Sequence, residues 1–202
     1  MPLAKKADFF TAEAYLEWEK GNEIKHEYIN GEVFPMYETH AMAGAKDAHV
    51  TVTLNVAALL KSHLRGGPCR VYMADMKVQV EAANQFFYPD VVVTCNPTDR
   101  SADYFKSHPA LIVEVLSEST AAYDRGRKFE FYRQLDSLRE YVLVDPDRFS
   151  VDCFRRDAAT HHWVLYSSAA GDTVELASVD MRAPIEVFYE DVVFPEKSGR
   201  PG

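Results

Sequence analysis

Hydrophobic residues gather in short runs along the middle of the chain, and two of these runs are apolar almost throughout. Residues 110–116 read Ala-Leu-Ile-Val-Glu-Val-Leu, and residues 139–146 contain a second run of this kind. Such runs are typical of strands that are covered on both faces of an α/β sheet. Residues 119–135 between them have helical spacing, so the sequence predicts a βαβ unit with two parallel strands.

The rest of the chain completes an α/β fold in which helices flank a mixed central sheet. An Asn-Gly pair between two β-prone runs predicts a hairpin turn at Asn30-Gly31. The predicted elements are a helix over 11–20, the hairpin over 25–34, a long helix over 47–65, strands over 70–80 and 86–93, and antiparallel strands over 149–194 at the C-terminal end. We expect one domain over 11–195, an N-terminal extension over 1–10 and a frayed tail over 196–202.

Composition limits the classes of function. The 22 Lys and Arg residues stand against 31 Asp and Glu residues, and the formal net charge of -9 excludes a generally basic surface for nucleic acid. No apolar run approaches the roughly 20 residues that span a bilayer, and the first residues lack the apolar core of a signal peptide. The three cysteines are far apart and odd in number, so we expect free thiols in a reducing cytoplasm.

Two carboxylates occupy unusual places in the apolar pattern. Glu114 lies inside the run 110–116, where a glutamate needs a cation, a metal or a water-filled cleft; the alternative is a strand with one solvated face. Asp90 follows Pro89 at the head of Val-Val-Val, which is also an ordinary place for a strand to begin. If their strands are neighbours, the two carboxylates converge at one end of the sheet. Their mutual repulsion raises the pKa of one of them unless a divalent metal ion lies between them, so the pair predicts a metal site.

Lys128 completes a chemical set with these carboxylates. At about 100° per residue, the apolar arc of the predicted helix has Lys128 near its centre and Asp124 at its margin. The lysine either extends its ammonium into water or pairs with Glu114 or a metal site. Two carboxylates that hold Mg²⁺, with Mn²⁺ as a substitute, and a lysine that stabilises charge on phosphorus suit phosphodiester hydrolysis.

Four segments resemble the Uma family, whose members are classed as restriction endonucleases of the PD-(D/E)XK superfamily. They are residues 27–32, 88–93, 113–120 and 140–146, in the expected order, and the resemblance covers most of the chain. It implies a restriction-endonuclease-like fold, DNA as substrate and Mg²⁺ as cofactor.

The resemblance also assigns roles to single residues. Asp90 matches the motif aspartate and Glu114 the second motif acid. Leu116 stands where the superfamily has lysine, and Lys128 matches a lysine that this family has on the following helix.

Three further residues enter through the same resemblance. Glu27 matches the acid of the first hairpin and is either a metal ligand or an exposed hairpin glutamate. His49 matches a histidine at the start of the long helix, where a lone histidine is more often structural than catalytic. Asp75 is a further acid that could point toward the same cleft.

Assembly and binding depend on basic and aromatic residues. Lys61, Arg65, Arg70 and Lys77, and also Arg125, Arg127 and Arg133 beside Lys128, either contact phosphates or are ordinary solubilising charges. The aromatic residues of 149–194 either form a homodimer interface, which would match the symmetry of duplex DNA, or complete the protomer's own core.

We therefore expect a cytoplasmic Mg²⁺-dependent endonuclease in which Asp90, Glu114 and Lys128 act on DNA. The alternative is a degenerate nuclease fold that serves as a non-catalytic binding or assembly module, favoured by Leu116 and the acidic charge. A hydrolase of another phosphate ester is a third class.

Overall fold

The computed structural model describes residues 10–36 and 46–194, so the predicted tail over 196–202 and residues 1–9 of the extension lie outside the described residues. The helical elements are α1 (Ala12–Glu19), α2 (Asp47–His63), α3 (Ala121–Tyr123), a π-helical turn (Asp124–Lys128) and α4 (Phe129–Tyr132), with short 3-10 turns elsewhere. The strands are β1 (His26–Ile29), β2 (Glu32–Pro35), β3 (Arg70–Met73), β4 (Lys77–Val80), β5 (Gln85–Phe87), β6 (Val91–Thr94), β7 (Phe105–Lys106), β8 (Pro109–Val115), β9 (Glu140–Val144), β10 (Ser150–Arg156), β11 (Trp163–Ala169), β12 (Thr173–Leu176) and β13 (Met181–Pro184). No helix in this part of the chain is long and apolar enough to cross a membrane.

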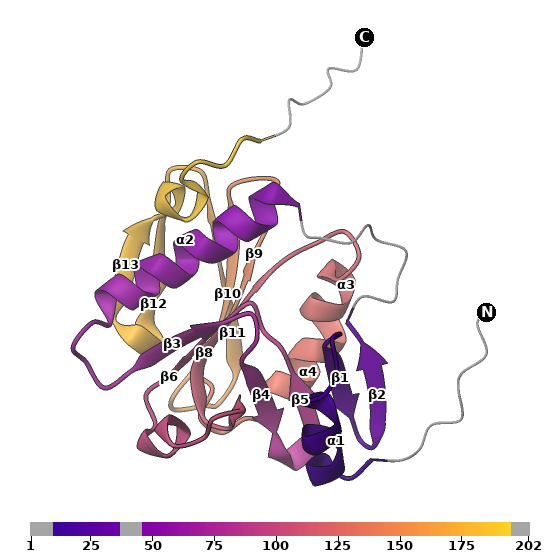
Figure 1. Cartoon of the computed structure of the whole chain (residues 1–202). Helices are drawn as coiled ribbons and strands as arrows, with labels where there is room; N and C mark the ends of the chain where they lie inside the picture. Colours follow the sequence, from indigo (N-terminus) through magenta and orange to yellow (C-terminus); the bar gives the residue numbers. More distant parts are fainter. Residues whose placement is uncertain (1–9, 37–45, 195–202) are drawn as a thin grey trace.

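A six-stranded mixed sheet forms the centre of the molecule, in the order β11-β10-β9-β8-β6-β3 (Figure 1). β8 and β9 are parallel neighbours, as the predicted βαβ unit requires. β10 and β11 extend the sheet beyond β9 by antiparallel pairing, which confirms the predicted C-terminal strands. β12 and β13 instead form a separate two-stranded sheet.

The predicted strands over 70–80 and 86–93 are each wrong in one respect, because each is two strands in two sheets. β3 and β6 belong to the central sheet, whereas β4 and β5 belong to a five-stranded sheet in the order β2-β1-β5-β4-β7. Ala74 has a positive φ of 54° where the first strand breaks. Pro89 lies in the second break, and proline has no N–H with which to continue a strand ladder.

The predicted hairpin and the first two helices are confirmed. Asn30 and Gly31 both have positive φ, 54° and 99°, at the turn between β1 and β2. The side chain of Thr11 accepts a hydrogen bond from the N–H of Ala14 and so caps α1.

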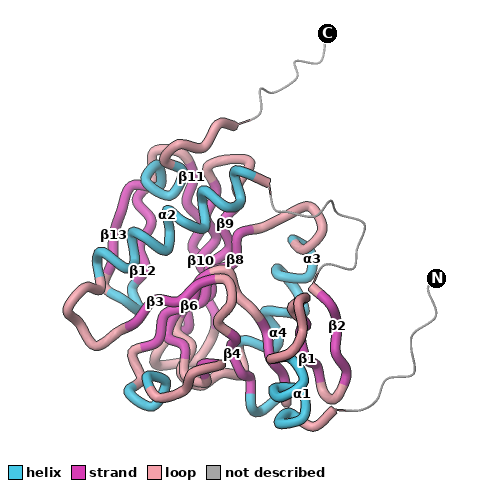
Figure 2. The backbone as a smooth tube through the Cα atoms, in the orientation of Figure 1, coloured by secondary structure: helices cyan, strands magenta, loops and turns pink. Residues whose placement is uncertain are grey.

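The central sheet separates two apolar layers. α2 packs on one face, where Val52, Val56 and Leu60 join a buried cluster with β6, β8 and β9. Tyr132 and Leu135 pack on the other face, and Figure 2 shows α2 and α4 on different sides of the sheet strands. Both faces of β8 are therefore covered, which explains its apolar sequence.

The aromatic residues of the C-terminal region mostly complete the protomer's own core. Phe188 and Tyr189 are buried in the layer under α2, and Phe154 and Trp163 pack against the opposite layer. Tyr166 on β11 is about half exposed. These aromatics therefore give no support to the predicted homodimer, which stays a prediction.

The helix predicted over 119–135 has a different form from the one expected. Three residues of α3 are followed by the five-residue π-helical turn and then by α4. π-helical turns are rare and often occur at functional sites. Asp124 and Lys128, at the two ends of this turn, are both buried.

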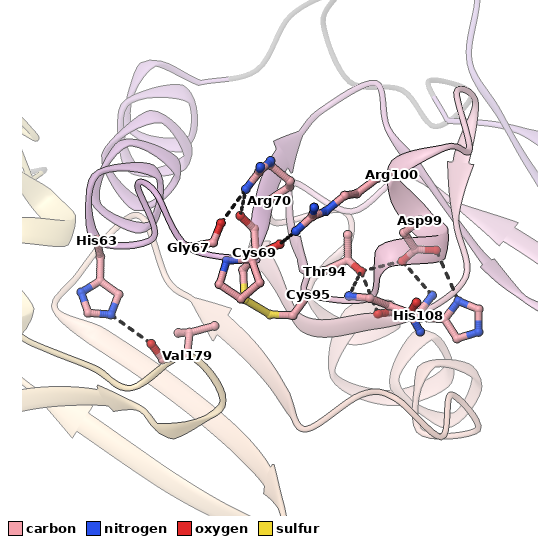
Figure 3. Close-up of a disulfide and its surroundings, with 12 residues drawn as sticks. His63, Gly67, Cys69, Arg70, Thr94, Cys95, Asp99, Arg100, His108 and Val179 are labelled. Carbon is pink, nitrogen blue, oxygen red and sulfur yellow. Dashed lines mark hydrogen bonds and ion pairs between the residues drawn. A yellow bond between two sulfur atoms is a disulfide. The ribbon is translucent and has the colours of Figure 1, made fainter.

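The prediction of three free cysteines is wrong, because Cys69 and Cys95 form a disulfide (Figure 3). They are 26 residues apart in the sequence, but β3 and β6 pair in a register that places Arg70 opposite Thr94. Cys69, just before Arg70, and Cys95, just after Thr94, are consequently cross-strand neighbours. Cys153 is a free buried thiol, as expected.

Candidate functional site

Asp90 and Glu114 lie at the same end of the central sheet. Asp90 comes directly before β6, and Glu114 is the next-to-last residue of β8, which pairs antiparallel with β6. The N–H of Asp90 donates to Glu114 Oε2 at 3.4 Å, and the N–H of Val115 donates to Asp90 Oδ2 at 2.7 Å. The predicted convergence of the two carboxylates is therefore present.

The ammonium of Lys128 contacts Glu114 in the interior of the protein. Lys128 Nζ lies 2.8 Å from Glu114 Oε1, and it is also 3.5 Å from Asp124 Oδ1 and 3.7 Å from Glu27 Oε1. Glu114 is 2% exposed and Lys128 is 5% exposed. The lysine therefore pairs with Glu114 rather than extending into water, and the solvated-face alternative for Glu114 is wrong.

Three tyrosine hydroxyls hold the acids of this cluster. Tyr132 donates to Glu114 Oε1 at 3.3 Å, Tyr123 donates to Glu27 Oε2 at 3.2 Å, and Tyr141 donates to the backbone carbonyl of Asp124 at 2.9 Å. The sequence pattern did not predict these roles for the three tyrosines. The buried position of Tyr132, one helical turn after Lys128, was the available signal.

The cluster has more acidic than basic groups, and its titration reflects this. Burial raises the pKa of Glu114 well above its usual value, Lys128 opposes the rise, and the nearby charges of Asp124 and Asp90 add to it. Burial alone lowers the pKa of Lys128, but Glu114, Tyr132, Asp124 and Glu27 outweigh it and hold that pKa well above the usual value. Lys128 therefore stays charged, and Glu114 takes up a proton more readily than an ordinary glutamate does.

His49 is the residue that links the site to the long helix. It lies in the first turn of α2, and its Nε2 is 3.6 Å from Asp90 Oδ2. Burial disfavours the imidazolium, but the nearby carboxylate of Asp90 outweighs it and raises the pKa of His49. The side chains of His49 and Asp90 are 21% and 25% exposed, so solvent reaches the site on their side.

Glu27 reaches the cluster through Lys128 and Tyr123. Burial raises its pKa, and Lys128 partly offsets the rise. Within residues 10–36 and 46–194, no three His, Cys, Asp or Glu side chains are arranged to hold one metal ion. The structure therefore does not bring Glu27 to Asp90 and Glu114 as a third ligand.

The oxygen atoms of Asp90 and Glu114 nevertheless fit a hard divalent cation. Mg²⁺ is commonly bound by one or two carboxylates and several waters, rather than by a cage of protein ligands. Glu114 Oε2 has one long hydrogen bond, to the N–H of Asp90 at 3.4 Å, and the carboxylate of Asp90 is open to solvent on one side. These two side chains would hold the metal.

The remaining candidate residues lie elsewhere. Asp75 is 83% exposed and pairs with Lys25 at 2.5 Å, so the structure does not bring it into the site. Arg125 pairs with Asp152 at 2.7 Å, and Arg127 lies over the ring of Phe131.

Comparison with known proteins identifies the family. A model of the Uma2 family, described as "Putative restriction endonuclease", matches residues 12–185. The chain is 35% identical over 182 residues to slr1290 of Synechocystis sp., covering 90% of this chain and 92% of the relative. It is 31% identical over 179 residues to sll1609 of the same organism, covering 87% and 96%. Both relatives are described as uncharacterized proteins.

A solved structure has the same fold. The crystal structure of "a putative nuclease belonging to DUF820" from Anabaena variabilis aligns with a TM-score of 0.70 at 14% sequence identity, covering 91% of this chain and 99% of that chain. The likeness confirms the predicted restriction-endonuclease-like mixed α/β fold. Together with the family model, which covers nearly all of the described residues, it supports one conclusion: this chain is a member of the Uma2 family.

Proposed function

We propose that this protein is a metal-dependent endonuclease that hydrolyses DNA phosphodiester bonds. One observation supports it above all. A buried lysine lies 2.8 Å from Glu114 at the sheet end where Asp90 accepts the N–H of Val115. Ionised groups are expensive to bury, so a core that needed only stability would contain apolar side chains here.

Each residue of the site has a distinct role in this proposal. Asp90 and Glu114 hold Mg²⁺, or Mn²⁺ as a substitute, and the metal supplies charge neutralisation at phosphorus and acidifies water. Lys128 stays protonated and directs its ammonium at the developing negative charge. Tyr132 and Tyr123 fix the acids around that ammonium, so its position is set before substrate binds.

His49 has a positioning role. Its imidazole lies against Asp90 Oδ2, and this contact holds the carboxylate at the exposed side of the site. Residue 116, where the superfamily has a lysine, is a leucine here. Leu116 is buried in the apolar layer that contains Tyr132. Lys128 supplies the ammonium from the following helical segment instead.

A second candidate is a nuclease fold that has lost hydrolysis and acts as a binding or assembly module. Glu114 Oε1 already accepts contacts from Lys128 and Tyr132, and Glu114 is 2% exposed. These contacts leave Glu114 little access to a metal ion, and this favours the second candidate.

Cleavage of supercoiled plasmid separates the two. We expect nicked or linear product with Mg²⁺ or Mn²⁺ and none with EDTA. Asp90→Asn and Lys128→Met should abolish cleavage, whereas Lys20→Met should retain it, since Lys20 is an exposed lysine on the rim of α1. Cleavage that persists in Asp90→Asn and Lys128→Met would assign the activity to a contaminant. Absence of cleavage in the wild type with either metal would favour the binding module.

A further inference from the structure

Basic residues from the end of α2 and the segment that follows it line a hollow of about 190 Å³. Its lining includes Lys61 from the last turn of α2, Arg65 from the following loop and Arg70 from the start of β3. All three side chains belong to exposed residues. Arg100 approaches the same loop from the other side and donates to the carbonyl of Pro68 at 2.7 Å (Figure 3).

These four cations have no acidic partner within residues 10–36 and 46–194. The residues that line the hollow also include no Asp or Glu, although the chain as a whole has 31 acidic and 22 basic residues. The negative end of the α2 dipole offsets only about half a charge. A local excess of positive charge therefore remains around the hollow.

The guanidinium groups of Arg70 and Arg100 are hydrogen-bonded to backbone carbonyls of the loop. Arg70 donates to the carbonyls of Gly67 and Cys69 at 2.9 and 2.8 Å. The Cys69–Cys95 disulfide ties this loop to the end of β6. A guanidinium has five N–H donors, so each arginine keeps donors for an oxyanion after these bonds are made.

The edge strand β3 joins the hollow to the candidate active site. Arg70 is at one end of β3, and just beyond the other end the N–H of Ala74 donates to the carbonyl of Asp90 at 3.1 Å. Arg70 and Ala74 are four residues apart, or about 13 Å at about 3.3 Å per residue. Each strand of a duplex has one phosphate per about 3.4 Å of helix axis, so about four nucleotides cover this distance when the helix axis runs along β3.

We propose that the hollow lined by Lys61, Arg65 and Arg70 binds backbone phosphates of a nucleic acid, about four nucleotides from the phosphodiester at Asp90 and Glu114. The proposal rests on the proposed nuclease function and adds to it a second contact point for the substrate. It also explains how an acidic protein binds an acidic polymer, because the attraction is confined to one place.

The test is fluorescence anisotropy with a labelled duplex of about 20 base pairs, in EDTA so that cleavage plays no part, over a series of salt concentrations. The binding variant is the triple substitution Lys61→Gln, Arg65→Gln and Arg70→Gln. The matched control removes three exposed positive charges elsewhere, by Lys20→Gln, Arg139→Gln and Arg182→Gln. Circular dichroism melting checks that both triple variants are folded.

We expect the binding variant to raise the dissociation constant about tenfold or more, and to reduce the slope of log K against log salt by about two to three. The control should change both quantities much less. Equal losses in the two variants, or none in the binding variant, would overturn the proposal. So would loss of inorganic phosphate binding, measured by calorimetry, with unchanged affinity for the duplex, because the hollow would then be a small-anion site.

The two proposals fail separately. If the wild type cleaves plasmid and the binding variant has unchanged affinity, phosphate binding by the hollow is excluded and the nuclease assignment stands. If the wild type does not cleave but binds DNA in a way that depends on Lys61, Arg65 and Arg70, phosphate binding by the hollow stands and the proposed hydrolysis is excluded.

Discussion

Replacing Lys128 with methionine should destabilise the protein in a way that depends on pH. The methionine retains the apolar bulk of the lysine stem, so the change removes mainly the ammonium. That ammonium lies 2.8 Å from Glu114, 3.5 Å from Asp124 and 3.7 Å from Glu27. The variant therefore leaves three carboxylates together in the interior without their cation.

The expected magnitude follows from the burial of this cluster. Removing one partner of a buried ion pair typically costs about 3–5 kcal/mol, and we expect a loss in this range at neutral pH. The pKa of Glu114 is already raised well above 4.5, and without Lys128 it rises further. A carboxyl whose pKa is higher in the folded than in the unfolded state favours folding at low pH, and this contribution is lost as the pH rises through the folded pKa. The deficit of the variant should therefore be small near pH 4 and grow toward neutral pH.

Urea unfolding of wild type, Lys128→Met and the double variant Glu114→Gln/Lys128→Met, at a series of pH values, measures this effect. The double variant should recover about 1–3 kcal/mol of the single variant's loss at neutral pH, because the nearest unpaired carboxylate is gone. Lys20→Met is the matched control, since Lys20 and Glu17 form an exposed pair, and its curves should follow the wild type at every pH. A loss of stability in Lys128→Met that is the same at every pH would show that the unpaired carboxylates are not its cause.

Three further predictions test the frame around the site. Asp99→Asn should destabilise the protein by about 1–3 kcal/mol at neutral pH. Burial raises the pKa of Asp99, but hydrogen bonds from Thr94, Ser107 and His108 outweigh it and lower that pKa below 3.8. The stabilisation from these bonds is lost as the pH falls through the lowered pKa, so the melting temperatures of variant and wild type should converge there. Leu60→Ala, at a fully buried position, should lower the free energy of unfolding by about 2–5 kcal/mol. A smaller loss, measured by urea unfolding, would mean that the layer under α2 relaxes around the cavity. Gly31→Ala, at a φ of 99°, should lower stability by about 1 kcal/mol or more, and an unchanged melting temperature would count against the hairpin turn.

The apolar pattern predicted the centre of the fold well, because burial on both faces leaves a continuous signature in β8 and β9. It failed where the chain passes between sheets. Residues 70–80 and 86–93 are continuous β-prone stretches, yet each changes sheet within a few residues. Local propensity does not specify which neighbour a strand pairs with, so such a transfer leaves little trace beyond Pro89 and the turn at Ala74.

Site prediction succeeded for charges in apolar surroundings and failed for groups defined by tertiary contact. Glu114 and Lys128 are anomalous in their own segments, which is why the sequence indicated them. The roles of Tyr123 and Tyr132 depend on acids from β1 and β8, and tyrosine is ordinary in a helix. The Cys69–Cys95 pair was missed for a related reason, since only the register of β3 against β6 brings the two residues together.

Anomalous diffraction from crystals soaked in Mn²⁺ tests whether Asp90 and Glu114 hold a metal ion, because it locates the ion without depending on turnover. We expect one strong peak between the carboxylates of Asp90 and Glu114, and no such peak in Asp90→Asn crystals. Wild-type crystals that bind Mn²⁺ only elsewhere, or not at all at saturating concentration, would exclude a metal site at Asp90 and Glu114.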